Sequence, residues 1–286
     1  MYLTKKEVVA ELLSRGFEVE ERQVIKNGVK LDGICFTNEV KNGANVAPVI
    51  YLDLIIRDAN AQNMTLDEVV EEIVKLYENN KNAPFNTDEI LSRDFILKNI
   101  TIGMQKTSSE NIVKKESDFE GIECYLLVKG LTPTGYSREI FSMQIRKDIL
   151  ERAGITEEVA WDVAEKNLKN ESEILNMSDI IKGLVNDDTV IGLEESEVNM
   201  FVISNKCRTK GASAILNKEL LKKLADEYDT DKLVVLPSSI HEMIVIPCVR
   251  GEENDLLEFS MMVKEVNSFE VEPQERLTDR AYIIEV

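Results

Sequence analysis

The densest group of reactive side chains in the sequence is the polar segment Pro237-Ser238-Ser239-Ile240-His241-Glu242, which lies between two apolar runs. It holds the only histidine of the chain, two hydroxyl groups and a carboxylate. A serine nucleophile needs a general base, and a histidine oriented by a carboxylate is the usual one. One hypothesis is therefore a hydrolase or nucleotide-handling enzyme centred on Ser238, Ser239, His241 and Glu242.

The spacing of this segment argues against that hypothesis. The serines lie only two or three positions before His241, and no GxSxG nucleophile elbow surrounds them. In a strand, His241 and Glu242 would point to opposite faces and would not act on one atom. We prefer a structural connector whose hydroxyls and imidazole bond to nearby backbone groups, which leaves no assigned catalytic residue.

The four cysteines lack the spacing of a metal site or a redox motif. Cys35, Cys124, Cys207 and Cys248 are widely separated, and each lies in or beside an apolar run. We expect buried free thiols in a reducing compartment, with no disulfide and no zinc site.

The segment from Lys210 to Ala214 follows an expected strand and precedes an expected helix, but lacks the GxxxxGK[ST] spacing of a phosphate-binding loop. Its small residues favour close packing; the alternative is an anion held at the helix N-terminus. We expect neither a metal ion nor a cofactor.

Charge is the strongest compositional signal. The chain of 286 residues has 53 acidic and 34 basic residues, a net charge of −19, and 43% hydrophobic residues. The hydrophobic share indicates a real core, and the charge opposes direct binding to nucleic acid. No run has the roughly 20 apolar residues of a membrane span. The N-terminal segment has the pattern of an amphipathic helix, whereas a signal peptide would have a continuous apolar core, so we expect a cytoplasmic protein. The acidic charge favours a basic partner protein.

Three acid-rich stretches could meet such a partner: the helix expected over 65–77, the run Asn186–Val198, and the tail after Gly251. If they converge on one face, their field would steer a basic protein onto it; if they are spread evenly, the charge serves solubility. The partner-binding residues predicted from the first two stretches are Asp67, Glu68, Glu71, Asp187, Asp188, Glu194, Glu195 and Glu197.

The first part of the chain predicts an α+β arrangement. Thr4 and Glu7 have capping-box spacing, and Asn27-Gly28 is a hairpin signal. The expected elements are a helix over Thr4–Arg15, strands over Phe17–Ile25, Leu31–Phe36 and Pro48–Ile56, and a helix over Thr65–Tyr77.

The remainder alternates between helical and strand patterns. In the middle we expect helices over Asp94–Met104 and Thr156–Leu168, a loop over Gln105–Ser117, and strands over Glu123–Val128 and Ile140–Ile145. Trp161 lies off the helical stripe, and we expect it to pack against a neighbouring element. In the C-terminal third we expect strands over Met200–Ser204 and Ala281–Ile284, helices over Asn217–Tyr228 and Asn254–Val266, and a strand pair over Lys232–Ile246.

These patterns predict an α+β or mixed α/β fold, with mixed sheets flanked by helices and an antiparallel strand pair near the C-terminus. The polar run that ends near residue 117 divides the chain into an N-terminal α+β region, 1–117, and a C-terminal mixed α/β region, 118–286; the alternative is one continuous domain.

Three segments, Asn27–Ile55, Gly211–Tyr228 and Leu236–Pro247, carry a resemblance that covers nearly the whole chain. In this order they resemble an uncharacterised bacterial domain-of-unknown-function family of gut anaerobes, often carried on integrated mobile elements. The family has no established activity, so the resemblance assigns no catalytic residue. It implies a context in which genes serve transfer, regulation or the defeat of host defences.

Two functional hypotheses follow. The first is a non-enzymatic acidic interaction protein: a mobile-element-encoded inhibitor, of the anti-CRISPR or anti-restriction type, whose carboxylates replace phosphates in the basic groove of a nucleic-acid-handling defence protein. The second is the enzyme centred on the connector. The acidic excess favours the first, and the compact polar connector favours the second.

Overall fold

The computed structural model describes residues 2–37, 49–80, 87–131, 140–184, 199–237, 239–248 and 255–286. The chain forms two compact units: unit 1 is Met1–Ser92 with Gly130–Phe141, and unit 2 is Arg93–Lys129 with Ser142–Val286. The division expected after residue 117 falls inside unit 2, between two strands that pair with each other.

Unit 1 places helices on a three-stranded antiparallel sheet of order β1-β2-β3. The hairpin predicted at Asn27-Gly28 is confirmed, since both residues have positive φ (48° and 77°) and connect paired strands. The elements are α1 (Lys5–Ser14), β1 (Val19–Lys26), β2 (Val29–Phe36), β3 (Val49–Tyr51), α2 (Leu52–Ala61), α3 (Leu66–Asn80) and α4 (Thr87–Ile90).

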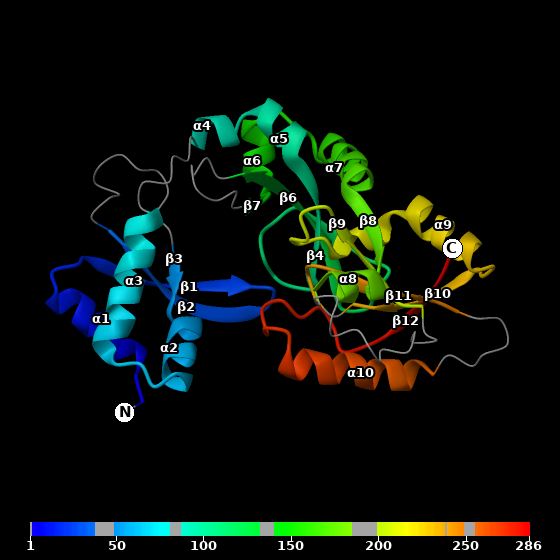
Figure 1. Ribbon diagram of the computed structural model, residues 1–286. Coiled ribbons are helices and arrows are strands. Elements are labelled where there is room, and N and C mark those ends of the chain that lie inside the picture. Colours follow the sequence, from blue (N-terminus) through cyan, green and yellow to red (C-terminus); the bar gives the residue numbers. More distant parts are fainter. Residues whose placement is uncertain are drawn as a thin grey trace. The chain divides into compact units, whose positions relative to one another are not determined.

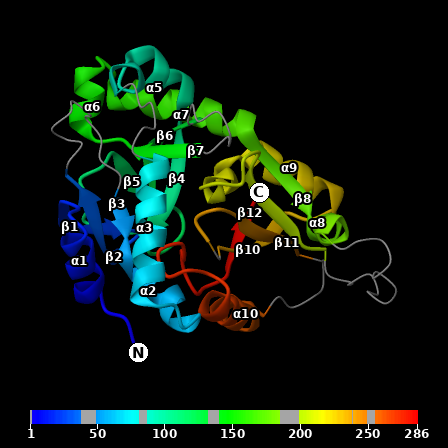
Figure 2. The ribbon, with the colours of Figure 1, turned by 60° about the vertical axis from the view of Figure 1, so that its left-hand side comes forward.

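Two helices of unit 1, α1 and α3, begin at a capping box. Thr4 and Glu7 form a complete capping box before α1, and Thr65 and Glu68 bond in the same way before α3. The inner faces of α1, α2 and α3 share one apolar core with β2 and β3 (Figure 1, Figure 2).

The prediction of a strand over Pro48–Ile56 is wrong in its second half. The structure has only the short strand β3 there, and α2 begins at Leu52. Leu52, Ile56 and Ala59 are buried at helical spacing, so the period of 3.6 prevails over the β-branched composition of the run.

Unit 2 contains a four-stranded sheet of order β4-β6-β5, in which β7 also pairs with β6. The helix expected over Asp94–Met104 is wrong in its second half, because Ile100–Met104 forms a fully buried strand. The expected loop over Gln105–Ser117 also contains the strand β5. The elements are α5 (Arg93–Asn99), β4 (Ile100–Lys106), β5 (Lys114–Glu116), β6 (Ile122–Leu131), β7 (Ile140–Gln144), α6 (Lys147–Arg152) and α7 (Glu157–Glu171).

Gly103 of β4 lies directly opposite Tyr125 of β6, and the tyrosine ring occupies the space above the glycine. A Cβ atom on Gly103 would lie 2.6 Å from the Cζ atom of Tyr125. No side chain fits there unless the ring moves.

A second sheet in unit 2 has five antiparallel strands in the order β12-β10-β11-β9-β8. The predicted strand pair is confirmed: Val235 of β10 faces Val245 of β11 in the sheet interior, and both are fully buried. The elements are β8 (Ser172–Asn176), α8 (Met177–Leu184), β9 (Phe201–Asn205), the 3-10 helix η3 (Ala212–Leu216), α9 (Lys218–Glu227), β10 (Lys232–Leu236), β11 (Met243–Pro247), α10 (Leu256–Phe269) and β12 (Tyr282–Glu285).

The strand alternation of β10 divides the core of unit 2 between two faces. Leu233 and Val235 belong to the large core shared with α7, η3 and α9, whereas Val234 and Leu236 pack with Val263 of α10. Helix α10 therefore covers one face of the five-stranded sheet (Figure 1). Together the two units confirm the α+β class, but the strand pairs of their sheets are antiparallel where mixed sheets were expected.

Trp161 of α7 is half-buried against the large core, as predicted, and the Nζ atom of Lys115 lies 4.3 Å from the centre of its ring. Val159 of the same helix is 38% exposed. The inner face of α7 is formed by the buried residues Ala160, Ala164 and Leu168.

Candidate functional site

The imidazole of His241 is held by contacts to two other segments. Its Nδ1 atom accepts a hydrogen bond from the backbone N–H of Lys210 at 3.2 Å, and its Nε2 atom lies 3.4 Å from a carboxylate oxygen of Glu275. The backbone carbonyl of His241 accepts hydrogen bonds from Gly211 N–H and from the Ser204 hydroxyl. His241 therefore joins the connector to the loop after β9.

The serines are not arranged as nucleophiles around this ring. The Ser239 hydroxyl is buried and accepts a hydrogen bond from the backbone N–H of His241 at 3.1 Å, while Ser238 lies outside the described residues. Glu275, not the half-buried Glu242, is the carboxylate at the ring. The sequence offered no signal for Glu275, because it follows α10 in an irregular segment. These contacts favour the structural interpretation of the connector.

Close packing explains the small residues of the Lys210–Ala214 segment. A Cβ atom on Gly211 would lie 2.6 Å from the backbone nitrogen of Asn205 and 2.8 Å from the carbonyl oxygen of His241. The buried Ser213 hydroxyl donates a hydrogen bond to the Ile102 carbonyl at 2.5 Å. Both Gly211 and Ser213 are buried, which favours close packing over an anion site in this segment.

A buried polar cluster, which sequence reasoning missed, lies at the ends of β4, β5 and β6. The carboxylate of Glu123 accepts hydrogen bonds from Gln105 and Ser108 and forms an ion pair with Lys114, at distances of 2.9–3.1 Å. Gln105 and Ser108 also contact Glu110. Because a buried carboxylate is stable only when paired and hydrogen-bonded, the cluster holds these strands in register.

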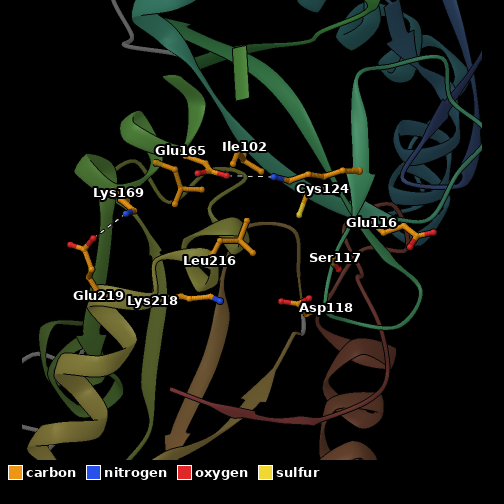
Figure 3. Close-up of a pocket in the computed structure, with 12 residues that line it drawn as sticks. Ile102, Glu116, Ser117, Asp118, Cys124, Glu165, Lys169, Leu216, Lys218 and Glu219 are labelled. Atoms are coloured by element: carbon orange, nitrogen blue, oxygen red, sulfur yellow. Dashed lines mark hydrogen bonds and ion pairs between the residues drawn. The ribbon is translucent and has the colours of Figure 1, made fainter. Parts of the chain in front are cut away.

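Unit 2 also contains a cavity of about 430 Å³, between α7, the start of α9 and strands β4–β6 (Figure 3). Its floor is apolar and includes Ile102, Cys124, Leu168 and Leu216. Burial raises the pKa of the Cys124 thiol to about 11, so this thiol stays protonated at neutral pH and serves as an apolar wall.

Charged side chains of both signs surround the opening of this cavity. Lys115 pairs with Glu165 at 3.4 Å, and Lys169 pairs with Glu219 at 3.0 Å, a contact that lowers the pKa of Glu219 (Figure 3). The remaining charged lining residues are Glu116, Asp118 and Lys218.

The acids predicted to bind a partner have different surroundings. Asp67 pairs with Arg15, and hydrogen bonds from Thr65 lower the pKa of Glu68, whereas Glu71 is simply exposed. The other five predicted residues, Asp187, Asp188, Glu194, Glu195 and Glu197, lie outside the described residues.

Helix α10 exposes large apolar side chains on its outer face. Leu257, Met261 and Phe269 are 69%, 59% and 81% exposed, and Met262 and Val266 are also exposed. The carboxylates of Glu258, Glu265 and Glu270 are exposed among or beside them. Glu258 lies three and four residues before the two methionines, and Glu265 lies four before Phe269, so apolar and acidic groups are neighbours on one helix face. Sequence reasoning predicted this helix but not its apolar surface.

The cysteines are free thiols, as expected, but only three are buried. Cys207 is exposed, in the loop after β9, because the apolar run it follows ends with Asn205. Among the described residues, no three His, Cys, Asp or Glu side chains are grouped to hold a metal ion. None of the helices in those ranges has the length and apolar character needed to cross a membrane.

One family profile matches residues 4–285, which is nearly the whole chain. The chain belongs to a family of unknown function, DUF5688. No curated protein and no solved structure matches the chain. Membership of DUF5688 agrees with the resemblance to a domain-of-unknown-function family found in the sequence.

Proposed function

We propose that this protein is a non-enzymatic interaction protein, and that the outer face of α10 binds an apolar groove bordered by basic side chains on a partner protein. The observation that carries the proposal is the exposed apolar face of α10, with Leu257, Met261 and Phe269 more than half exposed. Contiguous exposed apolar surface on a soluble domain is characteristic of a binding site.

The charges beside this face define the kind of groove. Glu258, Glu265 and Glu270 outnumber Lys264, the basic residue on the exposed side of the helix. An amphipathic helix of this kind binds with its apolar residues in a groove, and its carboxylates favour Lys and Arg at the rim. The net charge of −19 adds long-range attraction toward the same partner.

The finer proposal names the partner as a nucleic-acid-handling host defence protein, inhibited by a protein encoded on a mobile element. Two observations support it: the acidic charge, which resembles that of a nucleic acid, and the family resemblance described from the sequence. Free thiols at all four cysteines support a reducing compartment such as the cytoplasm as the place of binding.

Site-specific crosslinking tests the proposal. A photoreactive phenylalanine analogue is placed at Met261 of α10 and, as the matched control, at Leu76, the exposed leucine of α3. We expect the Met261 position to crosslink one protein in the native host, at a peptide rich in Lys or Arg, and the Leu76 position not to do so. Equal crosslinking from both positions, none from Met261, or crosslinks only to a second copy of this chain would overturn the proposal.

A further inference from the structure

The cavity in Figure 3 combines two features of a small-molecule site. Its volume of about 430 Å³ is within the range of known ligand sites, about 300–1,000 Å³. Its floor is formed by Ile102, Cys124 and Leu168, each at most 5% exposed, with Leu216 beside them. Such a floor favours an apolar group.

A charged ligand can replace one partner in either of the two ion pairs at the opening. Lys115–Glu165 and Lys169–Glu219 join exposed side chains, and such pairs are worth about 0–1 kcal/mol. A ligand carboxylate or ammonium group can therefore replace either partner at little expense.

Lys218 and Asp118 have neither a hydrogen-bond nor an ion-pair partner among the residues that the structure describes. Figure 3 shows the Lys218 ammonium and the Asp118 carboxylate pointing toward one another across the opening. Lys218 is also the first residue of α9, where the helix dipole favours a negative group. The opening thus presents one anion-binding position and one cation-binding position above an apolar floor.

We propose that this cavity binds a zwitterion with an apolar side chain, which is a free apolar amino acid or a short apolar peptide. The ligand carboxylate binds Lys218, its ammonium group binds Asp118, and its side chain rests on Ile102, Cys124 and Leu216. This site is separate from the outer face of α10, so it stands or falls independently of the proposed partner.

The chain has a built-in reporter for this test. Trp161 is the only tryptophan, and Lys115, which lines the cavity, lies over its ring at 4.3 Å. A ligand bound in the cavity lies beside Lys115 and displaces it relative to the Trp161 ring, which changes the fluorescence of Trp161. Titrations use leucine, methionine, phenylalanine and the dipeptide Leu-Leu, with calorimetry as a second readout.

We expect saturable binding of at least one of these ligands, and the dipeptide arm separates free amino acids from peptides. N-acetyl-leucine lacks the ammonium group and leucinamide lacks the carboxylate. Each should bind about 10-fold or more weakly than leucine, because the loss of one hydrogen bond to a charged group lowers affinity by about that factor. Lys218→Ala and Asp118→Asn should weaken binding to a similar extent. The control Lys222→Ala removes a lysine of α9 that does not line the cavity and should leave binding unchanged.

The proposal is wrong if neither fluorescence nor calorimetry detects saturable binding at millimolar concentration. It is also wrong if the singly charged analogues bind as well as leucine, or if Lys218→Ala and Asp118→Asn, with unchanged circular dichroism, bind like the wild type.

Discussion

Helices α3 and α10 are nearly equal in length, 15 and 14 residues, yet the exposed face of α3 is mostly polar and that of α10 is rich in apolar side chains. Helix α3 buries Val69, Val70, Ile73 and Tyr77, and of its large apolar residues only Leu76, at 39%, counts as exposed. Helix α10 buries Val263 and Asn267 and exposes five large apolar residues.

The difference shows that apolar content and apolar burial are separate properties of a helix. The apolar stripe of α3 matches the core it covers, so its outer face is left to Asp, Glu and Lys. Helix α10 has more apolar residues than its sheet face can bury. That surplus is the reason for assigning binding to α10.

The largest effect is expected when a carboxylate is placed on the inner face of either helix. Ile73→Asp in α3 and Val263→Asp in α10 each bury an unpaired charge and should lower the free energy of unfolding by about 3 kcal/mol or more. Urea denaturation measures it. Wild-type stability in Val263→Asp would show that α10 does not pack on the sheet, and the comparison would fail.

Outer-face substitutions should separate binding from folding. Combining Met261→Lys with Phe269→Lys should weaken partner binding about 100-fold, as for interface anchor residues, while stability changes by about 0.5 kcal/mol or less. The matched change Leu76→Lys in α3 should alter neither quantity. Isothermal titration with the crosslinked partner measures affinity, and equal losses from both helices would remove the distinction between them.

A smaller effect is expected from the carboxylates of α10. Glu258→Lys with Glu265→Lys should slow association severalfold at low salt, with little change in dissociation, because exposed charges act mainly on encounter. Stopped-flow measurements from about 0.05 to 0.5 M salt test this, since screening strengthens severalfold over that range. An association rate independent of salt would contradict the proposal that the carboxylates of α10 attract a basic partner.

The smallest effect is expected in the connector. His241→Gln should lower the free energy of unfolding by about 1 kcal/mol, the contribution of one hydrogen bond, and should leave partner binding unchanged. A hundredfold loss of partner binding with the fold intact would show that His241, and not only α10, belongs to the binding site.

Local signals in the sequence predicted the parts of the fold that depend on neighbouring residues. The capping box of Thr4 and Glu7 and the Asn27-Gly28 turn are complete within a few residues. Ile100–Met104 was misassigned because its strand is buried on both faces, which removes the alternation that distinguishes a strand from a helix.

The candidate sites depend on long-range placement and were harder to predict. Lys115, Glu165 and Lys218 meet at one cavity only because β5, α7 and α9 converge in the fold. The apolar face of α10 was hidden for another reason. Met and Phe residues around the helix fit an inner stripe as well as an outer one, and only packing decides which face the sheet covers.

The tyrosine ring above Gly103 implies a constraint on the history of the family. A larger residue at position 103 is compatible with this sheet only if the ring at position 125 moves or is lost, and the ring in its present place needs glycine at 103. Neither substitution is neutral alone, so the two positions should change together in related sequences. Gly103 and Tyr125 are therefore expected to form one of the clearest co-varying pairs in an alignment of DUF5688 proteins.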